Sequence, residues 1–287
     1  MRDDVEIIVV DDCSPEDKNP LNELVRARFP ELNLPNVFFY STPQGGSAGR
    51  ARNVGLEHAQ GKWLLFADAD DFYTEALADV MNRLASSDSD ADIWYFKVRS
   101  VWSSDISRPA NRDVWNNYMV DRYLATGDSY DLRINHGPTW PLIIRHQLVK
   151  EHAIRFHETM YSNDGFFTCC CGFYARTIAV DPTVIYTITK RPGSLSSTPY
   201  WKMSCEECGI RMREAIEIDK FLHSQGMPLQ DSVFSGVFLN ALCSPKIAWE
   251  MVGLIHDSFD LSYPFIFAKV GWITIKKSIK RIIRNLK

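Results

Sequence analysis

Three things are scarce or missing in this 287-residue sequence: long apolar runs, cysteines in a pairing pattern, and acidic residues near the carboxyl end. No apolar run reaches the roughly 18 residues that a membrane-spanning helix needs. No internal repeat or low-complexity stretch is present, which excludes repeat architectures. The apolar fraction of 45% is ordinary, and the length suits one large α/β domain plus an appended region.

The cysteines do not form a disulfide or zinc pattern. There are seven, an odd number, and Cys169, Cys170 and Cys171 are consecutive, so they cannot all pair with one another in ordinary disulfide geometry. A reducing compartment is the simpler explanation. Cys205 and Cys208 have C-x-x-C spacing, but no second pair or histidine lies nearby to complete four zinc ligands. We therefore expect thiols on a helix surface, with a metal or redox site as the alternative.

The net charge of −4 hides an asymmetry between the body and the carboxyl end. After Asp260 no acidic residue follows, and the cations there are Lys269, Lys276, Lys277, Lys280, Arg281, Arg284 and Lys287. Apolar residues recur at helical spacing from Trp272 onward: Ile275, Ile279, Ile282 and Leu286. This pattern predicts a basic amphipathic helix that lies on an anionic membrane surface. The alternative is a helix that packs on the protein and leaves its charges in water.

Apolar patterning predicts alternating strands and helices in the first two thirds of the chain. Expected strands are 5–10, 36–40, 62–67, 92–98 and 141–145; expected helices are 47–59, 74–85 with Thr74 as N-cap, 146–152 and 164–176; and 178–190 is extended. Alternation of this kind favours a parallel or mostly parallel sheet covered by helices. The stretch 100–130 is weakly periodic, and 200–257 has a helical pattern. We expect domains at 1–199 and 200–287.

Three carboxylates follow the third expected strand. Asp68, Asp70 and Asp71 are too close in sequence to ionise together in an enclosed site without a compensating cation. Mg²⁺ and Mn²⁺ prefer oxygen ligands, often one or two carboxylates together with substrate phosphates. The pattern therefore predicts a metal–diphosphate site, and a solvated acidic turn is the alternative.

Further polar residues follow the first strand and the second. Asp11 and Asp12 end the first strand, and a Gly45-Gly46 loop lies between them and the acidic motif, with Arg50 and Arg52 just beyond. Because the carboxyl ends of parallel strands meet at one sheet edge, we expect these groups to lie close together. That edge would offer carboxylates to a base, ribose or metal, and guanidinium groups to phosphate.

With these motifs in place, the sequence resembles the family 2 glycosyltransferases of the GT-A fold. The matching segments are Ile-Val-Val-Asp11-Asp12-Cys-Ser14, Gly45-Gly46-Ser-Ala-Gly-Arg-Ala51-Arg52-Asn53-Val-Gly55-Leu, Gly61-Lys-Trp-Leu-Leu-Phe-Ala-Asp68-Ala-Asp70-Asp71, Ile154-Arg-Phe156-His-Glu and Asn163-Asp164-Gly-Phe-Phe167. The resemblance covers about residues 5–196. It implies a GT-A fold of class α/β, with a mostly parallel sheet flanked by helices and, beyond it, a helical C-terminal extension.

The resemblance also implies how a nucleotide-diphospho-sugar donor is bound. Asp12, with Asp11 beside it, would accept hydrogen bonds from the base or ribose, and Asp68 would bind the ribose or sugar. Asp70 would bind Mn²⁺ or Mg²⁺, assisted by Asp71. Arg52 would lie near the donor; the alternative is that it only pairs with Asp11 or Asp68.

Two further segments carry implied roles. Asp164 matches the family's general base, which takes the proton of the acceptor hydroxyl. The family usually has Glu-Asp here, and Asn163 replaces the Glu, which leaves Asp164 as the only carboxylate of the pair. The alternative for Asp164 is a helix N-cap. Lys190 and Ser194 lie in a segment that resembles the family's loop over the diphosphate, with a solvated loop as the alternative.

The expected function is an inverting glycosyltransferase of cell-surface polysaccharide biosynthesis that acts on a carbohydrate or lipid-linked acceptor. Alternatives are a sugar nucleotidyltransferase and a non-catalytic membrane-associated scaffold. We expect a cytoplasmic protein, peripheral on the cytoplasmic membrane face, with no nucleic-acid partner. The first recognisable element matches the family's second strand, so we expect a member shortened at its amino terminus, and whether it is active stays open.

Overall fold

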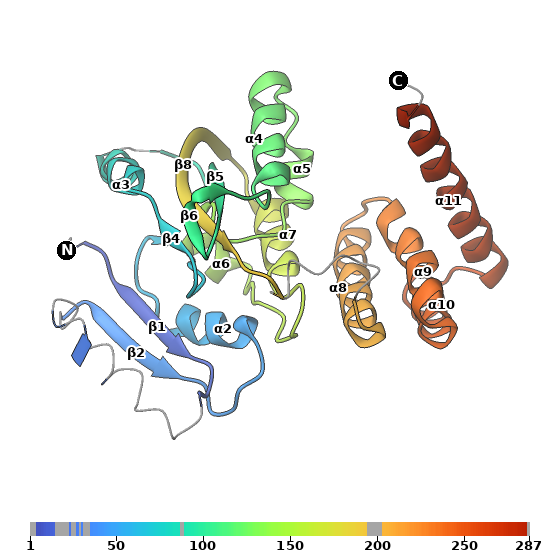
Figure 1. Ribbon diagram of the computed structural model, residues 1–287, viewed down its shortest axis with the longest axis horizontal. Coiled ribbons are helices and arrows are strands. Elements are labelled where there is room, and N and C mark those ends of the chain that lie inside the picture. Colours follow the sequence, from blue (N-terminus) through green and yellow to red (C-terminus); the bar gives the residue numbers. More distant parts are fainter. Residues whose placement is uncertain are drawn as a thin grey trace. The chain divides into compact units, whose positions relative to one another are not determined.

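The protein is described by a computed structural model that covers residues 4–14, 23, 27–28, 30, 35–86, 89–193 and 203–285. The chain forms two compact units, Met1–Ser194 and Leu195–Lys287, and each is described by itself (Figure 1). The expected domain boundary between residues 199 and 200 lies outside the described residues.

The first unit begins with a two-stranded parallel sheet. Strand β1 (Ile7–Asp11) lies beside β2 (Val37–Ser41), with Ile7 opposite Val37 and Asp11 opposite Ser41 (Figure 1). The nearly continuous apolar run of β1 is typical of a strand buried on both faces, but all five of its residues are only half-buried. Within the described residues β1 pairs with β2 alone, so its other edge has no neighbouring strand to cover it.

A six-stranded sheet forms the centre of this unit, with strands in the order β3-β7-β5-β8-β4 and β6 on β5. Its strands are β3 (Trp63–Leu64), β4 (Phe72–Tyr73), β5 (Ile93–Trp102), β6 (Asp105–Pro109), β7 (Leu142–Arg145) and β8 (Ile178–Lys190). The two longest, β5 and β8, are parallel, and the other pairs are antiparallel. The α/β class is confirmed, but the sheet is mixed rather than mostly parallel.

A short connection explains one of the antiparallel pairs, β5 with β6. Only Ser103 and Ser104 separate β5 from β6, and a turn this short can join only antiparallel strands. The strand predicted at 62–67 is also cut short after Leu64. Beyond it, tyrosine hydroxyls replace a strand partner: the Asp68 amide donates to Tyr186 Oη at 2.9 Å, and Tyr73 Oη donates to the Phe66 carbonyl at 2.8 Å. The chain therefore leaves the sheet just before the acidic motif.

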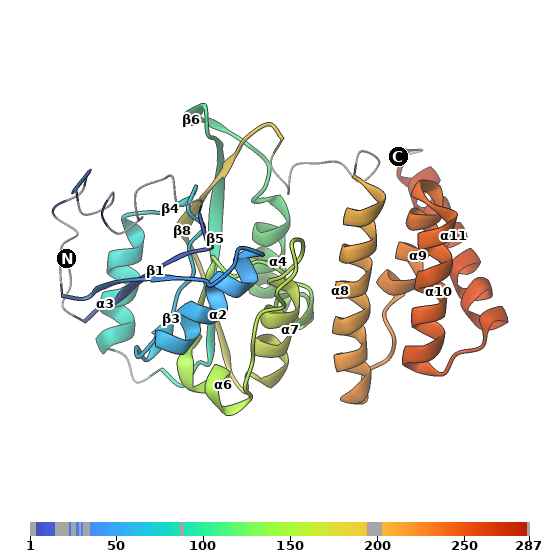
Figure 2. The same cartoon turned by 90° about the horizontal axis from the view of Figure 1, so that it is seen from below.

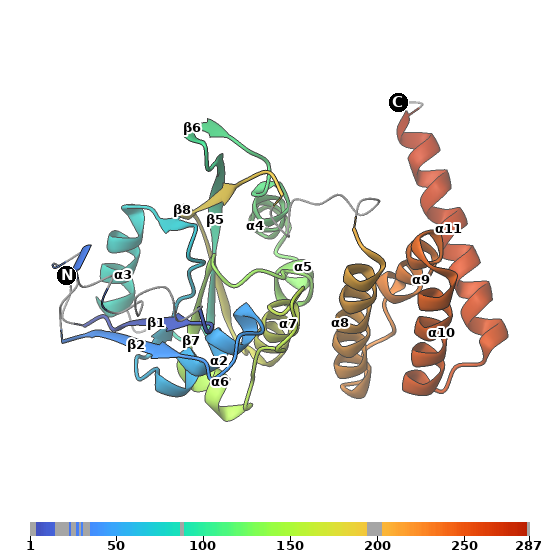
Figure 3. The same ribbon diagram turned by 60° about the horizontal axis from the view of Figure 1, so that its bottom comes forward.

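Helices cover both sides of the long β5–β8 pair (Figure 3). Helix α3 (Ala76–Ser86) lies on one side, and α4 (Val114–Thr126), α5 (Tyr130–Ile134) and α7 (Gly165–Tyr174) lie on the other. The buried core beneath α3 consists of Val80, Leu84, Phe96, Val98, Trp140, Ile143, Ile185, Tyr186 and Ile188. Helices α2 (Ala48–His58) and α6 (His146–Glu151) complete the unit. All of the helices predicted for this unit are confirmed. The elements β6, α4 and α5 were not predicted, because they fall in or next to the weakly periodic stretch 100–130.

Thr74, the predicted N-cap of α3, donates two hydrogen bonds to β8. Its hydroxyl donates to the carbonyl of Val184 at 2.7 Å, and its amide donates to the carbonyl of Ile185 at 2.8 Å. These bonds fasten the start of α3 to β8, because the loop after the acidic motif runs along that strand.

The second unit is helical, as predicted (Figure 2). It contains α8 (Cys205–Ser224), α9 (Asp231–Cys243), α10 (Pro245–Phe259) and α11 (Tyr263–Asn285). Its buried core is Met212, Ile216, Val233, Phe234, Val237, Met251, Val252, Ile255, Ile266 and Ile273. None of the helices in the described part of the chain is long and apolar enough to cross a membrane.

The cysteines with described side chains, all but Cys243, are reduced and form no disulfide with one another. The consecutive Cys169, Cys170 and Cys171 are buried in α7, and burial raises the pKa of the Cys170 and Cys171 thiols above the usual range. Cys205 is half-buried but Cys208 is 1% exposed, so the expectation of two surface thiols is wrong for Cys208. A thiol is small and weakly polar, so it packs in an interior readily.

Candidate active site

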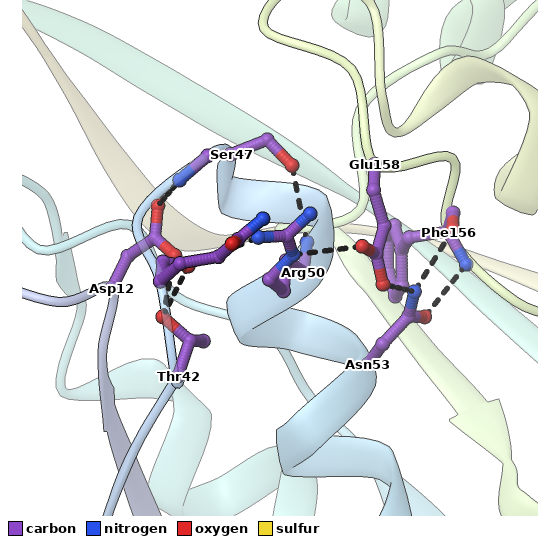
Figure 4. Close-up of polar contacts among 9 residues, drawn as sticks. Asp12, Thr42, Ser47, Arg50, Asn53, Phe156 and Glu158 are labelled. Atoms are coloured by element: carbon purple, nitrogen blue, oxygen red, sulfur yellow. Dashed lines mark hydrogen bonds and ion pairs between the residues drawn. The ribbon is translucent and has the colours of Figure 1, made fainter.

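The turn after β1 uses both of its aspartates to shape the backbone. Asp11 accepts hydrogen bonds from the Ser14 amide at 3.0 Å and the Ser14 hydroxyl at 2.5 Å. Asp12 accepts from Thr42 Oγ1 at 2.9 Å and from the Gly46 amide at 3.0 Å (Figure 4). Cys13, which directly follows Asp12, has a positive φ of 59°. Asp12 therefore joins the end of β1 to the Gly45-Gly46 loop, as the sequence predicted for this edge.

The glycine loop approaches the Asp12 backbone closely. A Cβ on Gly45 would lie 3.0 Å from the Asp12 carbonyl oxygen, which is tighter than most side chains allow. Helix α2 begins directly after this loop, and its N-cap Ser47 accepts from the Arg50 amide at 3.2 Å. The loop thus leads straight into the amino end of a helix, an end that carries partial positive charge.

Helix α2 is also fixed against the segment that precedes the expected base (Figure 4). Asn53 bonds the Phe156 backbone twice: its Nδ2 donates to the carbonyl at 3.0 Å, and its Oδ1 accepts from the amide at 2.9 Å. Arg50 Nε lies 2.8 Å from Glu158 Oε2. The hydrogen bonds from Arg50 and Asn53 lower the pKa of Glu158 below its ordinary value. Asn53 and Arg50 therefore hold residues 156–158 beside α2.

Arg52 connects the acidic motif to that same segment. Its Nη2 lies 2.6 Å from Asp68 Oδ1, and its Nη1 donates to Asn163 Oδ1 at 2.8 Å. Its guanidinium carbon also lies 5.5 Å from the Phe156 ring centroid. The sequence left two roles open for Arg52, and the pairing with Asp68 is present. The same side chain reaches Asn163, the residue before Asp164, which the sequence had not shown.

The acidic motif lies against the end of β8. Asp71 Oδ1 accepts from the Thr189 amide at 2.7 Å, and the Asp70 carbonyl accepts from the Thr189 hydroxyl at 2.8 Å. Burial raises the pKa of Asp71, and the neighbouring charges of Asp70 and Asp68 raise it further. The motif is therefore a compact group of carboxylates that repel one another.

Asp70 and Asp71 are the predicted ligands of a divalent cation, but within the described residues no group of three or more His, Cys, Asp or Glu could hold a metal ion. The Asp70 side chain is 49% exposed, and Arg191 Nη2 approaches it only to 3.8 Å. Two carboxylates with room beside them suit Mg²⁺ or Mn²⁺, because those ions complete their shells with water and phosphate oxygens. Asp70 and Asp71 stay a predicted metal pair.

Asp164 stands at the amino end of α7, as predicted. It occupies the N-cap position, but its side chain makes no capping hydrogen bond. Its neighbour Asn163 is buried, accepts from Arg52 and donates from Nδ2 to the Thr159 carbonyl at 3.1 Å. Ser162, just before them, has a positive φ of 56°. The alternative of a pure helix cap is thus not supported, and the half-buried carboxylate of Asp164 stays the predicted base.

Comparison with known proteins fits this arrangement. The sequence model described as Glycosyl transferase family 2 matches residues 1–176, more than half of the chain. The chain belongs to this family.

Two curated family 2 relatives have names that describe their activities. The poly(ribitol-phosphate) beta-N-acetylglucosaminyltransferase TarS of Staphylococcus aureus is 30% identical over 202 residues, 69% of this chain and 32% of TarS. A poly(ribitol-phosphate) beta-glucosyltransferase of Bacillus spizizenii is 25% identical over 203 residues, 69% of this chain and 30% of that protein. This chain therefore spans about a third of the length of either relative.

The fold likeness extends over nearly the whole chain. A crystal structure of residues 1–349 of S. aureus TarS in complex with UDP-GlcNAc has a TM-score of 0.56 and 19% identity, and the match covers 97% of this chain and 83% of that chain. At this identity the match shows the fold alone. The predicted GT-A fold of family 2 is thus confirmed.

Lys190 contacts residues outside the acidic motif. Lys190 Nζ donates to Asn111 Oδ1 at 2.8 Å and lies 5.1 Å from the Trp102 ring centroid, while Ser194 lies outside the described residues. The donor role of both stays a prediction. On the alternating faces of β8, Thr189 points to the acidic motif, so its neighbour Lys190 points elsewhere.

Sequence reasoning missed two cations beside this family 2 site. Arg112 Nη1 donates to the Thr189 carbonyl at 3.2 Å, and its positive charge lowers the pKa of Asp71 against the larger effect of burial. Arg191 follows Lys190 and lies near Asp70. Strand alternation along 178–190 could have favoured Arg191 over Lys190, but Arg112 comes from the stretch without a clear period, where no sequence signal was available.

Proposed function

We propose that this family 2 chain transfers a sugar from a nucleoside-diphosphate donor to a hydroxyl of a cell-surface polymer, with inversion at the anomeric carbon. UDP-GlcNAc and a poly(ribitol phosphate) acceptor are the first pair to test. Support comes from the names of TarS and of the Bacillus relative, and from the UDP-GlcNAc bound to TarS.

One observation carries the proposal: Arg52 contacts Asp68 and Asn163 at the same time. Asp68 belongs to the motif expected to bind the donor, and Asn163 precedes the expected base for the acceptor. A single guanidinium therefore fixes the spacing of the two halves of a transferase site. Such positioning lowers the barrier when two reactants must meet in one geometry.

The chemistry asked of the protein is a single displacement. The acceptor oxygen forms a bond to the anomeric carbon, the bond from that carbon to the phosphate oxygen breaks, and the nucleoside diphosphate leaves with the electron pair. Asp164 takes the acceptor proton as the oxygen attacks. Arg191 and Arg112 place positive charge beside the acidic motif. Mn²⁺ or Mg²⁺ held by Asp70 and Asp71 would supply further positive charge for the diphosphate.

Proton NMR of UDP-GlcNAc with the acceptor and Mn²⁺ tests this proposal. We expect UDP and a β-linked product to accumulate with the wild type, and turnover to fall at least about a hundredfold in Asp164→Asn, in line with the usual contribution of a general base. Asp113→Asn is the matched control, because Asp113 is also an N-cap aspartate without a capping side-chain hydrogen bond. Its turnover should equal that of the wild type.

Each other outcome contradicts the proposal in a distinct way. Parental turnover in Asp164→Asn would make Asp164 a structural residue. Pyrophosphate release from a nucleoside triphosphate and a sugar 1-phosphate would favour a nucleotidyltransferase. Absence of turnover with all common nucleotide sugars, in a protein that keeps its melting temperature, would favour a non-catalytic scaffold.

A further inference from the structure

Helix α11 has two apolar sides, and only one of them is buried in the core of the helical unit. Ile266 and Ile273 are at most 1% exposed and belong to the core of that unit. On a helix of 3.6 residues per turn, Ile275 lies on the opposite side, with Phe267 and Trp272 to its left and right. These three side chains are 55%, 49% and 63% exposed. We call Phe267, Trp272 and Ile275 the outer face of α11.

Aromatic rings of α10 extend this outer face. Trp249, 61% exposed, is stacked near Phe267 with ring centroids 6.1 Å apart, and near Tyr263 at 5.9 Å. His256 is stacked on Tyr263 at 4.4 Å. Large exposed rings in contact with one another form a continuous apolar patch, and such a patch marks an interaction site. Trp and Tyr are the side chains that proteins place at the boundary between lipid and water.

Helix α11 itself carries charge of one sign in the sequence. No acidic residue follows Asp260, and seven cations do. Two of these cations, Lys269 and Lys276, lie 3.6 Å and 3.3 Å from Asp231, which ties this part of α11 to α9. Further along the sequence follow Ile279 and Ile282 and the cations Lys277, Lys280, Arg281 and Arg284. The docked side and the outer face are therefore different sides of one basic helix.

We propose that the outer face of α11, with Trp249, binds an anionic bilayer surface with the helix lying in the plane of the interface. The apolar side chains enter the boundary between headgroups and acyl chains, and the cations contact lipid phosphates. The excess of positive charge selects this occupant over a second copy, because two copies of this face would bring like-charged helices together. No helix in the described ranges is suited to span the bilayer, which agrees with binding in the plane.

Co-sedimentation of the full chain with phosphatidylcholine vesicles, with and without phosphatidylglycerol, tests this proposal. We expect binding to the anionic vesicles only, and a decrease of at least about tenfold in the lipid partition coefficient for Trp272→Ser with Ile275→Ser. Trp115→Ser is the matched control, because Trp115 is a similarly exposed tryptophan on α4, 52% exposed, and it should bind like the wild type. All of these side chains are exposed, so melting temperatures should stay within experimental error of one another.

A second pair of substitutions tests the charge. Lys280→Glu with Arg284→Glu should lower binding to anionic vesicles at least about tenfold and remove most of its salt dependence. Equal binding to neutral and anionic vesicles would overturn the proposal. Unchanged vesicle binding by the Trp272→Ser, Ile275→Ser chain would also overturn it. If sedimentation velocity then showed a dimer for the wild type and a monomer for this double variant, the outer face would be assigned to contacts between copies.

Discussion

At the scale of single residues, Arg52 has the most consequential position in the site. It uses separate nitrogens for Asp68 and Asn163, and its guanidinium lies beside the Phe156 ring. The rigid fork of a guanidinium can contact two partners in fixed directions, whereas a lysine ammonium acts as one compact charge. Retaining the charge alone should therefore not retain the geometry.

We expect Arg52→Lys to lower kcat about tenfold and to destabilise the fold by only about 1 kcal/mol, since Asp68 is 35% exposed and solvent weakens the pair. Initial rates and melting temperatures measure the two effects. Arg83→Lys is the control, because Arg83 also pairs with an aspartate, Asp181, but on α3. Equal losses of kcat in the two variants would remove Arg52 from the site.

Residue types at the site were predictable where they form a local motif. The acidic motif, the Asp11-Asp12 turn and Asp164 could be located because each adjoins a strand end or helix start that the apolar pattern reveals. Arg112 and Thr189 could not, because their position at the site depends on which loop and strand end reach the sheet edge, and apolar periodicity does not show this.

At the scale of elements, the position of α2 depends on one glycine. A Cβ on Gly49 would lie 2.1 Å from the His157 carbonyl oxygen, which is an impossible contact without movement of the backbone. Gly55, in the same helix, has its nearest such neighbour, Val10 Cγ2, at 3.8 Å. The two glycines therefore form a matched pair with opposite expectations.

We expect Gly49→Ala to lower the free energy of unfolding by about 1–3 kcal/mol, because the helix must move away from residues 156–158. Gly55→Ala should raise it by about 0.5–1 kcal/mol, because alanine favours a helix interior. Urea unfolding followed by far-UV circular dichroism measures both. If Gly49→Ala were as stable as Gly55→Ala, α2 would not be packed on this segment.

In the helical unit, Asp219 of α8 makes stability depend on pH. Burial raises the pKa of Asp219 to about 6 from 3.8, although its carboxylate accepts from the Gln230 amide at 3.1 Å and 3.2 Å and His223 lies near enough to lower it. The folded state then holds a proton more tightly than the unfolded chain. The free energy of unfolding should therefore fall as the pH rises from about 4 to about 6.

Asp219→Asn removes this dependence and keeps an acceptor for the Gln230 amide. At pH 7 the variant should exceed the wild type by up to about 3 kcal/mol, and the difference should vanish below pH 4. Urea unfolding at several pH values between 4 and 7 provides the measurement. Glu250→Gln, at the surface of α10, is the control, and a pH-independent difference for Asp219→Asn would show that the Asp219 carboxyl is not perturbed.

Elements were predicted well where their pattern is local. Helix α2 and strand β8 were located within a residue or two of their predicted bounds, because period and caps are written in the sequence. The direction of pairing was not: β3 and β7 were expected in a mostly parallel sheet but pair antiparallel with their neighbours, and the short strand β4 was not predicted at all. Beyond the end of β3, the hydroxyls of Tyr73 and Tyr186 bond the backbone in place of a neighbouring strand. The apolar periodicity of the sequence cannot predict such bonds.

At the scale of the whole molecule, the chain belongs to glycosyl transferase family 2, and two separate surfaces carry the proposals. The acidic motif, Arg52 and Asp164 lie in the first unit, and the outer face of α11 lies in the second. Substitutions in the outer face of α11 should therefore leave sugar transfer intact, and substitutions at the acidic motif should leave vesicle binding intact. The vesicle variants should turn over UDP-GlcNAc like the wild type when the acceptor is soluble.

The central claim is that the acidic motif binds a donor diphosphate together with a divalent cation, and calorimetric titration of UDP tests it most directly. With Mn²⁺ present, we expect the wild type and Asp164→Asn to bind UDP equally, and Asp70→Asn to bind at least about tenfold more weakly, because one metal ligand is lost. Asp79→Asn, an exposed aspartate of α3, is the control and should bind like the wild type. Equal affinity for UDP with Mn²⁺ and with a chelator, or full affinity in Asp70→Asn, would contradict the claim.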